Sequence, residues 1–171
     1  MLKRTPPAAV ILRTPTHLLA FGLGAGLSPL APGTVGALLG LVLYWPLQGL
    51  PLLAYVGVVT AVAGIGMWVC DRSARALGVH DHSGIVLDEI VGYLVTMAGA
   101  PSGWFWALLG FILFRLFDVA KPWPVSWVDR RVGGGVGIML DDVVAGLYGL
   151  VAVQATALAL GQAMSGRLTL W

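Results

Sequence analysis

Two pairs of adjacent acidic residues lie inside apolar stretches of the chain. Asp141 and Asp142 belong to the segment GIMLDDVVAGLYG, and Asp88 and Glu89 belong to GIVLDEIVG. Neighbouring carboxylates repel each other, and a low-dielectric setting makes each charge costly. Stabilisation by a helix dipole, worth about 0.3–1 kcal/mol, accounts for one acid at a helix start but poorly for two. The pairs therefore indicate a functional site.

The two acidic segments are repeats of each other. GIVLDEIVG aligns without gaps to GIMLDDVVA, so that Asp88 matches Asp141 and Glu89 matches Asp142. Both segments begin apolar helices that run in the same direction, which predicts that the four carboxylates lie at one depth. Carboxylate oxygens, water and substrate phosphate are the ligands that Mg²⁺ takes in proteins. We therefore predict a Mg²⁺ site formed by these four residues.

Basic and hydroxyl side chains are expected near these acids. The segment FRLFDVAKPWP contains Arg115, Asp118 and Lys121, and the first two share a helix face because they are three residues apart. One interpretation is a structural ion pair with snorkelling side chains; the sharper one is a phosphate clamp beside the carboxylates. In LSPLAPGTVG, the hydroxyls of Ser28 and Thr34 and the free N–H groups of a helix start are further candidates for binding phosphate.

The motif HDH supplies His80, Asp81 and His82. Two histidines two residues apart in a loop are weak evidence for a metal site, and the chain has no Cys/His cluster with zinc spacing. A surface or interfacial role is the favoured interpretation of these histidines.

The composition is that of a membrane protein. Of the 171 residues, 58% are hydrophobic and 11% are charged, whereas soluble domains carry about 25% charged residues. The length fits one domain, residues 1–171. The single cysteine, Cys70, excludes an internal disulfide, and a net charge of +2 is too small to indicate a nucleic-acid partner.

Five apolar runs must position the acids. They are Val35–Leu50, Leu52–Cys70, Ile85–Ala100, Trp104–Phe117 and Val143–Leu160. The runs predict an all-α, polytopic membrane bundle with about five membrane helices, although the third and fourth reach spanning length only with their charged ends. The piece Leu18–Leu27, interrupted by glycines, is expected to be a short interfacial or re-entrant helix.

The charges alternate between connections. The connections 46–51 and 99–103 carry no charge, whereas 71–84 and 118–137 carry most of the charged residues, together with the N-terminal arm. All charged loops then face one side, which the positive-inside rule assigns to the cytoplasm.

The chain resembles the phosphatidylglycerophosphatase A family from about His17 to about Gly149. The resemblance rests on three long motifs and their order: HLLAFGLGAGLSPLAPGTVG, GVHDHSGIVLDEIVG and FRLFDVAKPWPVSWVDRRVGGGVGIMLDDVVAG. The residues that fall on family motifs are Asp81, Asp88, Glu89, Arg115, Asp118, Lys121, Pro122, Asp129, Asp141 and Asp142.

This resemblance implies a bacterial enzyme of the inner membrane with its active site facing the cytoplasm. It implies Mg²⁺-dependent hydrolysis of phosphatidylglycerophosphate to phosphatidylglycerol and phosphate. The expected catalytic residues are Asp88, Glu89, Asp118, Asp141 and Asp142, and the expected substrate-binding residues are Ser28, Thr34, Arg115 and Lys121. The alternative is a transporter of small anions or ions, which would also place carboxylates in repeated membrane helices, but near the midplane.

Overall fold

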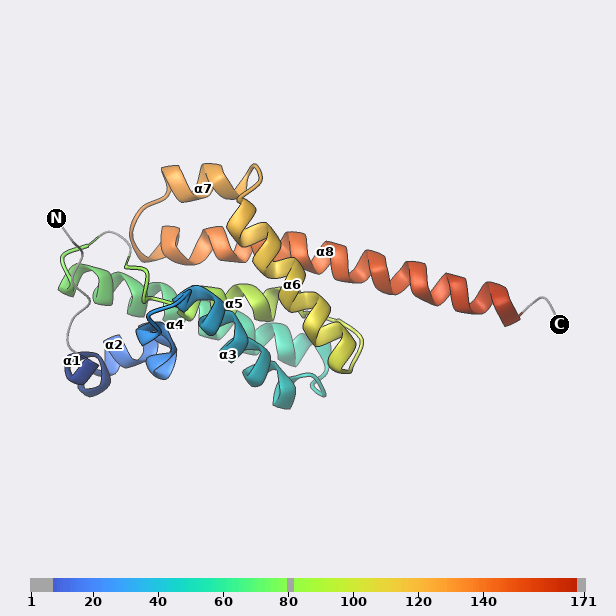
Figure 1. Ribbon diagram of the computed structural model, residues 1–171, viewed down its shortest axis with the longest axis horizontal. Coiled ribbons are helices and arrows are strands. Elements are labelled where there is room, and N and C mark those ends of the chain that lie inside the picture. The colour runs from blue at the N-terminus through green and yellow to red at the C-terminus, as the bar shows by residue number, and fades with distance from the viewer. Residues whose placement is uncertain (1–7, 80–81, 169–171) are drawn as a thin grey trace.

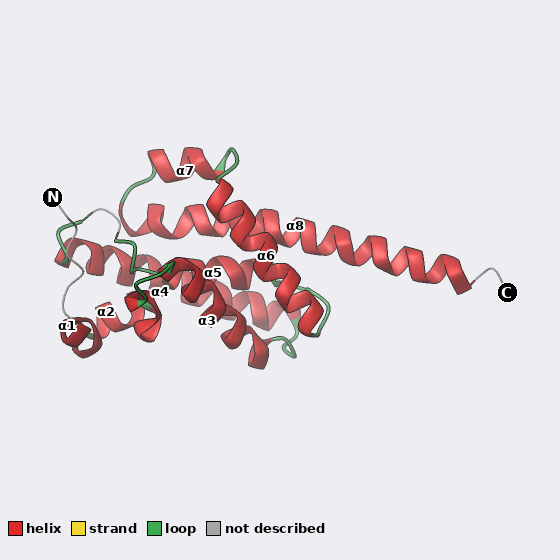
Figure 2. Ribbon diagram, viewed as in Figure 1, coloured by secondary structure: helices red, strands yellow, loops and turns green. Residues whose placement is uncertain are grey.

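The computed structural model describes residues 8–79 and 82–168, and these form helices joined by turns and loops (Figure 2). The elements in chain order are α1 (Ala8–Arg13), α2 (Pro15–Ala20), the 3₁₀ helix η1 (Gly22–Leu27), α3 (Pro32–Leu47), α4 (Leu52–Ala76), α5 (Leu87–Thr96), α6 (Trp104–Ala120), α7 (Val125–Arg131) and α8 (Gly134–Leu168). The predicted all-α fold class is confirmed.

The expectation of about five membrane helices is not confirmed. Among the described residues, two helical stretches are long and apolar enough to cross a membrane, Leu52–Ala76 and Gly134–Gln162. Helix α5 has 10 residues and extends about 15 Å, half of a hydrocarbon core of about 30 Å. It is shorter than its apolar run because the chain turns at Gly99, whose φ is 67°, and Pro101 follows.

The described part of the N-terminal region forms three short helices, and the predicted helix Leu18–Leu27 is divided between α2 and η1. The glycines between Phe21 and Leu27 break the helix, because Gly22, Leu23 and Gly24 all have positive φ values. His17 Nδ1 lies 2.8 Å from the Ser73 hydroxyl, so this region is held against α4 by a buried polar contact.

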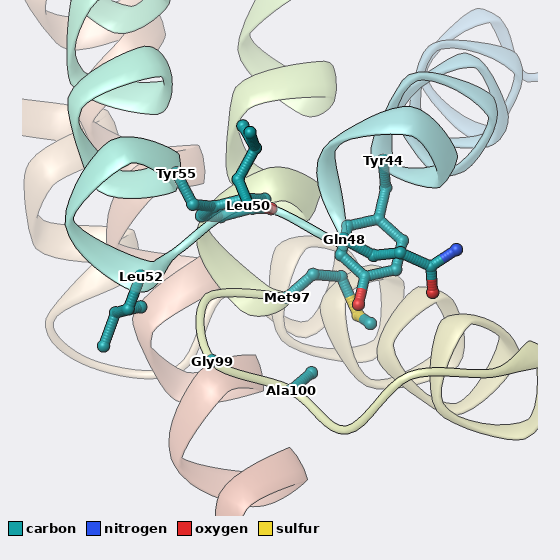
Figure 3. A pocket seen from close by; sticks show the side chains of 8 residues that line it. All are labelled: Tyr44, Gln48, Leu50, Leu52, Tyr55, Met97, Gly99 and Ala100. Atoms are coloured by element: carbon teal, nitrogen blue, oxygen red, sulfur yellow. The ribbon is translucent and has the colours of Figure 1, made fainter.

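The connections meet at two ends of the bundle, as the charge pattern predicts. Gln48 and Leu50 of one uncharged connection line the same cavity as Gly99 and Ala100 of the other (Figure 3). At the charged end, the Gly135 N–H near the start of α8 donates to Asp71 Oδ1 of α4 at 3.2 Å.

Helix α8 is the central element of the fold and extends beyond the other helices towards the C-terminus (Figure 1). It packs in parallel against α5. Gly92 of α5 lies against Gly146 of α8, and the Thr96 hydroxyl, one turn further along α5, donates to the carbonyl oxygens of Gly92 and Gly146. The repeated acidic segments therefore lie side by side and point in one direction, as their alignment predicts.

A test of this crossing is the replacement of Gly146 by alanine. A Cβ at Gly146 would collide with the Gly92 carbonyl oxygen, whereas a Cβ at Gly161 of the same helix meets open space. Gly146→Ala should lower the melting temperature by several degrees, because overpacking costs about 1–3 kcal/mol. Gly161→Ala should leave it unchanged or raise it, because alanine favours a helix by about 1 kcal/mol over glycine. Equal effects in a thermal melt would contradict the close crossing.

Candidate active site

Three carboxylates converge where α5 and α8 meet. Asp88, Glu89 and Asp142 each offer an oxygen, and these atoms lie within 4.8 Å of one another. Asp88 and Asp142 are 8% and 4% exposed. Two of the buried oxygens, Asp88 Oδ1 and Glu89 Oε2, have no hydrogen-bond partner. Three acids in this setting are unfavourable when all of them are ionised, and a bound cation would relieve their repulsion.

Helix geometry decides which acids join this cluster. Asp88 and Glu89 lie in the first turn of α5, whereas Asp142 lies about two turns inside α8, which begins at Gly134, earlier than the sequence indicates. The dipole of α8 acts mainly on its first turn, so it does not account for an acid at this position. Neighbours on a helix diverge by about 100°. Asp141 accordingly points away from the cluster and lies 2.8 Å from the Lys121 ammonium.

Arg115 and Asp118 form a part-buried ion pair on α6, which confirms that they share a helix face. Asp118 also lies close enough to Glu89 and Asp142 to interact with both electrostatically, and Arg115 likewise interacts with Glu89. The predicted catalytic and phosphate-binding residues of α6 are therefore brought to the edge of the three-carboxylate cluster.

Lys121 ends α6 in a left-handed conformation, with φ 42° and ψ 55°. Its ammonium lies 2.6 Å from Asp129 Oδ1 of α7 and 2.8 Å from Asp141 Oδ2 of α8. Burial opposes its positive charge, but the hydrogen bonds to the two carboxylates outweigh burial and raise the pKa of Lys121 above its usual range. The pairing of Lys121 with Asp129 was not predicted from the sequence, because the two residues are eight positions apart and do not share a helix.

The start of α3 closes the site on a further side. A Cβ at Gly33 would collide with Glu89 Oε1 and would lie 3.3 Å from Arg115 Nη1. A side chain at this position would therefore require the Glu89 carboxylate to shift. Gly33 lies in the first turn of α3, beside the free N–H groups of the helix start and the half-buried Thr34. This agrees with the predicted contribution of the LSPLAPGTVG turn to the site.

The remaining predicted residues have other surroundings. The Ser28 hydroxyl donates to the Leu30 carbonyl at 2.8 Å and so stabilises the loop before α3. His82 is buried, accepts a hydrogen bond from the Gly84 N–H at 3.0 Å and lies against the Phe21 ring. His80 and Asp81 lie outside the described residues.

A separate cavity of about 190 Å³ lies at the opposite, uncharged end of the helices (Figure 3). Tyr44 and Gln48 of α3 and its C-terminal turn, Tyr55 of α4 and Met97 line it, and it contains no acidic or basic side chain. It therefore lacks groups for binding a charged phosphate, and the three-carboxylate cluster is the candidate active site.

These features define an α-helical protein with helices suited to a membrane and a buried acidic cluster flanked by basic residues, a combination suited to a phosphate group and a cation. A family model described as Phosphatidylglycerophosphatase A matches residues 18–157, and the chain belongs to this family. The family resemblance of the motifs is thereby confirmed.

Three curated relatives cover most of the chain. Phosphatidylglycerophosphatase A of Escherichia coli (strain K12) is 45% identical over 137 residues, 80% of each chain. Phosphatidylglycerophosphatase A of Haemophilus influenzae is 41% identical over 91% of this chain and 96% of its own. A Bacteroides thetaiotaomicron protein, provisionally named a phosphatidylinositol-3-phosphatase, is 35% identical over 84% of this chain and 94% of its own. No solved structure gives a significant match.

Proposed function

We propose that this protein hydrolyses the terminal phosphate monoester of phosphatidylglycerophosphate, leaving phosphatidylglycerol and inorganic phosphate. The observation that carries the proposal is the cluster of Asp88, Glu89 and Asp142 beside Arg115 and Lys121, in a chain whose E. coli and H. influenzae relatives are named for this reaction. The transporter alternative is not favoured, because the family and these relatives are named as phosphatases.

Mg²⁺ is the cofactor we propose for this site. The cluster offers only oxygen donors, and two of its buried oxygens lack a hydrogen-bond partner, which fits a hard divalent cation. We assign Asp88, Glu89 and Asp142 to the metal, whereas Asp141 supports it from outside by holding Lys121. When bound, Mg²⁺ supplies Lewis-acid activation of water and neutralises charge on the phosphate.

The chain's own residues bind and orient the phosphate. Arg115 interacts electrostatically with Glu89, and Lys121 pairs with Asp141, the neighbour of Asp142. Both cations are held in place by aspartates, Arg115 by Asp118 and Lys121 by Asp129 and Asp141. Charge-assisted hydrogen bonds from these side chains fix the phosphoryl oxygens. The N–H groups at the start of α3, brought close by Gly33, add donors at a helix N-terminus. Asp118 orients Arg115.

Phosphate release from phosphatidylglycerophosphate by the purified protein tests the proposal. We expect turnover with Mg²⁺ and its loss in EDTA, restored by added Mg²⁺. Phosphatidylinositol 3-phosphate, the substrate suggested by the name of the third relative, serves as the comparison lipid. Absence of phosphate release with Mg²⁺ present would contradict the proposed function.

We further propose that the site faces the cytoplasm of a bacterial inner membrane. The support is that the carboxylates lie towards the end of the bundle that carries the positively charged loops. In a Cys70→Ser background, cysteines placed at Arg75 and Arg130 should react with a membrane-impermeant thiol reagent only after cells are opened. Cysteines at Gly49 and Ser102 should react in intact cells. Labelling with the opposite sidedness would reverse the assignment.

A further inference from the structure

An open apolar groove of about 270 Å³ lies along α8, away from the face on which Gly146 contacts α5. Pro124, which precedes α7, lines it together with Val144, Leu147, Tyr148 and Val151 of α8. We call it the α8 groove. Its lining is almost entirely apolar, and none of its residues belongs to the acidic cluster or its basic partners.

The α8 groove continues from the ion pair between Lys121 and Asp141, which flanks the three-carboxylate cluster. Asp141, Val144, Tyr148 and Val151 follow one another at intervals of three, four and three residues, so they lie along one helix face. The face that carries Asp142 and Gly146 instead packs against α5. The groove therefore begins one turn beyond the pair formed by Lys121 and Asp141 and extends about 10 Å along the helix axis.

The wall of the groove is held in a fixed position. The Tyr148 hydroxyl donates to the Trp123 carbonyl at 2.9 Å, and the Tyr148 ring lies 5.4 Å from the Phe117 ring. This tyrosine thus joins α8 to α6 and to the turn before α7. Leu147 and Val151 stay 49% and 64% exposed, so the apolar surface is open to an occupant.

We propose that the α8 groove binds an acyl chain of the lipid substrate, with the phosphate at Lys121 and the chain directed towards the C-terminal part of α8. This proposal rests on the proposed function. A ligand that binds along Lys121, Val144 and Val151 would place a phosphate at one end and an apolar chain along about 10 Å. A lipid phosphate has this polarity, and its chain would lie along the helix from the charged end of the bundle inwards.

The test compares two substrates in the same mixed detergent micelles with Mg²⁺: dioleoyl phosphatidylglycerophosphate and its dihexanoyl analogue, whose chains are too short to extend along the whole groove. Val151→Trp fills the groove and should lower the ratio of kcat/KM for the long-chain over the short-chain lipid about tenfold, because two lost methylene contacts already correspond to that factor. Leu147→Ala should lower the ratio severalfold without filling the groove. Leu158→Trp, on the same helix at 67% exposure but beyond the groove, should leave the ratio within twofold of wild type.

The proposal is overturned if both groove variants leave the long-chain to short-chain ratio of kcat/KM unchanged. A variant that slows both substrates equally counts as unchanged. This result is expected if the groove contacts only bulk lipid or a second copy of the chain. If Val151→Trp does not fold, the ratio measured with Leu147→Ala decides. Failure of the wild type to hydrolyse either lipid would instead refute the proposed function itself.

Discussion

Asp142→Asn is expected to lower kcat for phosphate release by at least about 100-fold while leaving the protein folded. The substitution keeps the size of a side chain that is 4% exposed, but it removes one of the three clustered charges. A bound metal contributes several kcal/mol to transition-state stabilisation, and each 1.36 kcal/mol is a factor of ten in rate. The metal-free protein should be as stable as wild type or more stable, because repulsion among Asp88, Glu89 and position 142 is relieved.

Asp71→Asn is the matched control for this experiment. Asp71 lies outside the cluster and accepts the Gly135 N–H, which an asparagine oxygen also accepts. Its ion pair with the exposed Arg75 contributes little. We expect activity within about threefold of wild type for Asp71→Asn. Equal kcat values for Asp142→Asn and Asp71→Asn would show that Asp142 does not contribute to catalysis.

Lys121→Met should lower kcat/KM for the lipid about 10- to 100-fold. A hydrogen bond to a charged group is worth about 1.5–3 kcal/mol, and this substitution removes the charge that we assign to the phosphate. Lys121→Arg keeps the charge and should recover part of the activity. Lys121→Met also leaves Asp129 and Asp141 without their shared partner, so the melting temperature must be measured together with the kinetics.

Arg130→Met provides the comparison for Lys121→Met, because Arg130 is an exposed cation of α7 near the same end of the bundle. It should change kcat/KM less than about threefold. If Lys121→Met retains wild-type kcat/KM, Lys121 is a structural link between α7 and α8 and not a phosphate ligand.

The gapless repeat predicted the most useful part of the structure. Because GIVLDEIVG and GIMLDDVVA match residue by residue, it was possible to expect parallel helices with their acids at a similar depth, and α5 and α8 pack in this way. The sequence could not say which acids point at one another. That depends on the rotation of each helix, which Gly92 and Gly146 fix through their close contact.

Other features required long-range contacts that the sequence pattern does not encode. Hydropathy indicated where helices occur but overestimated the length of α5, because an apolar run continues through the turn at Gly99. The short helix α7 was not predicted, and with it the pairing of Lys121 with Asp129 was missed. The close approach of Gly33 to Glu89 could not be predicted either, because a proline–glycine turn is common and its sequence does not identify the residues that it contacts.

The central claim is that Asp88, Glu89 and Asp142 form a Mg²⁺ site, and Mg²⁺-dependent stabilisation tests it most directly. The melting temperatures of wild type and Asp142→Asn are to be compared in EDTA and across a Mg²⁺ titration. At a concentration 100 times the dissociation constant, binding adds about 2.7 kcal/mol of stability, or roughly 5–10 °C for a chain of this length. We predict this rise for wild type and for Asp71→Asn, and its loss in Asp142→Asn. A rise of equal size in all three proteins, or no rise in wild type, would contradict the account.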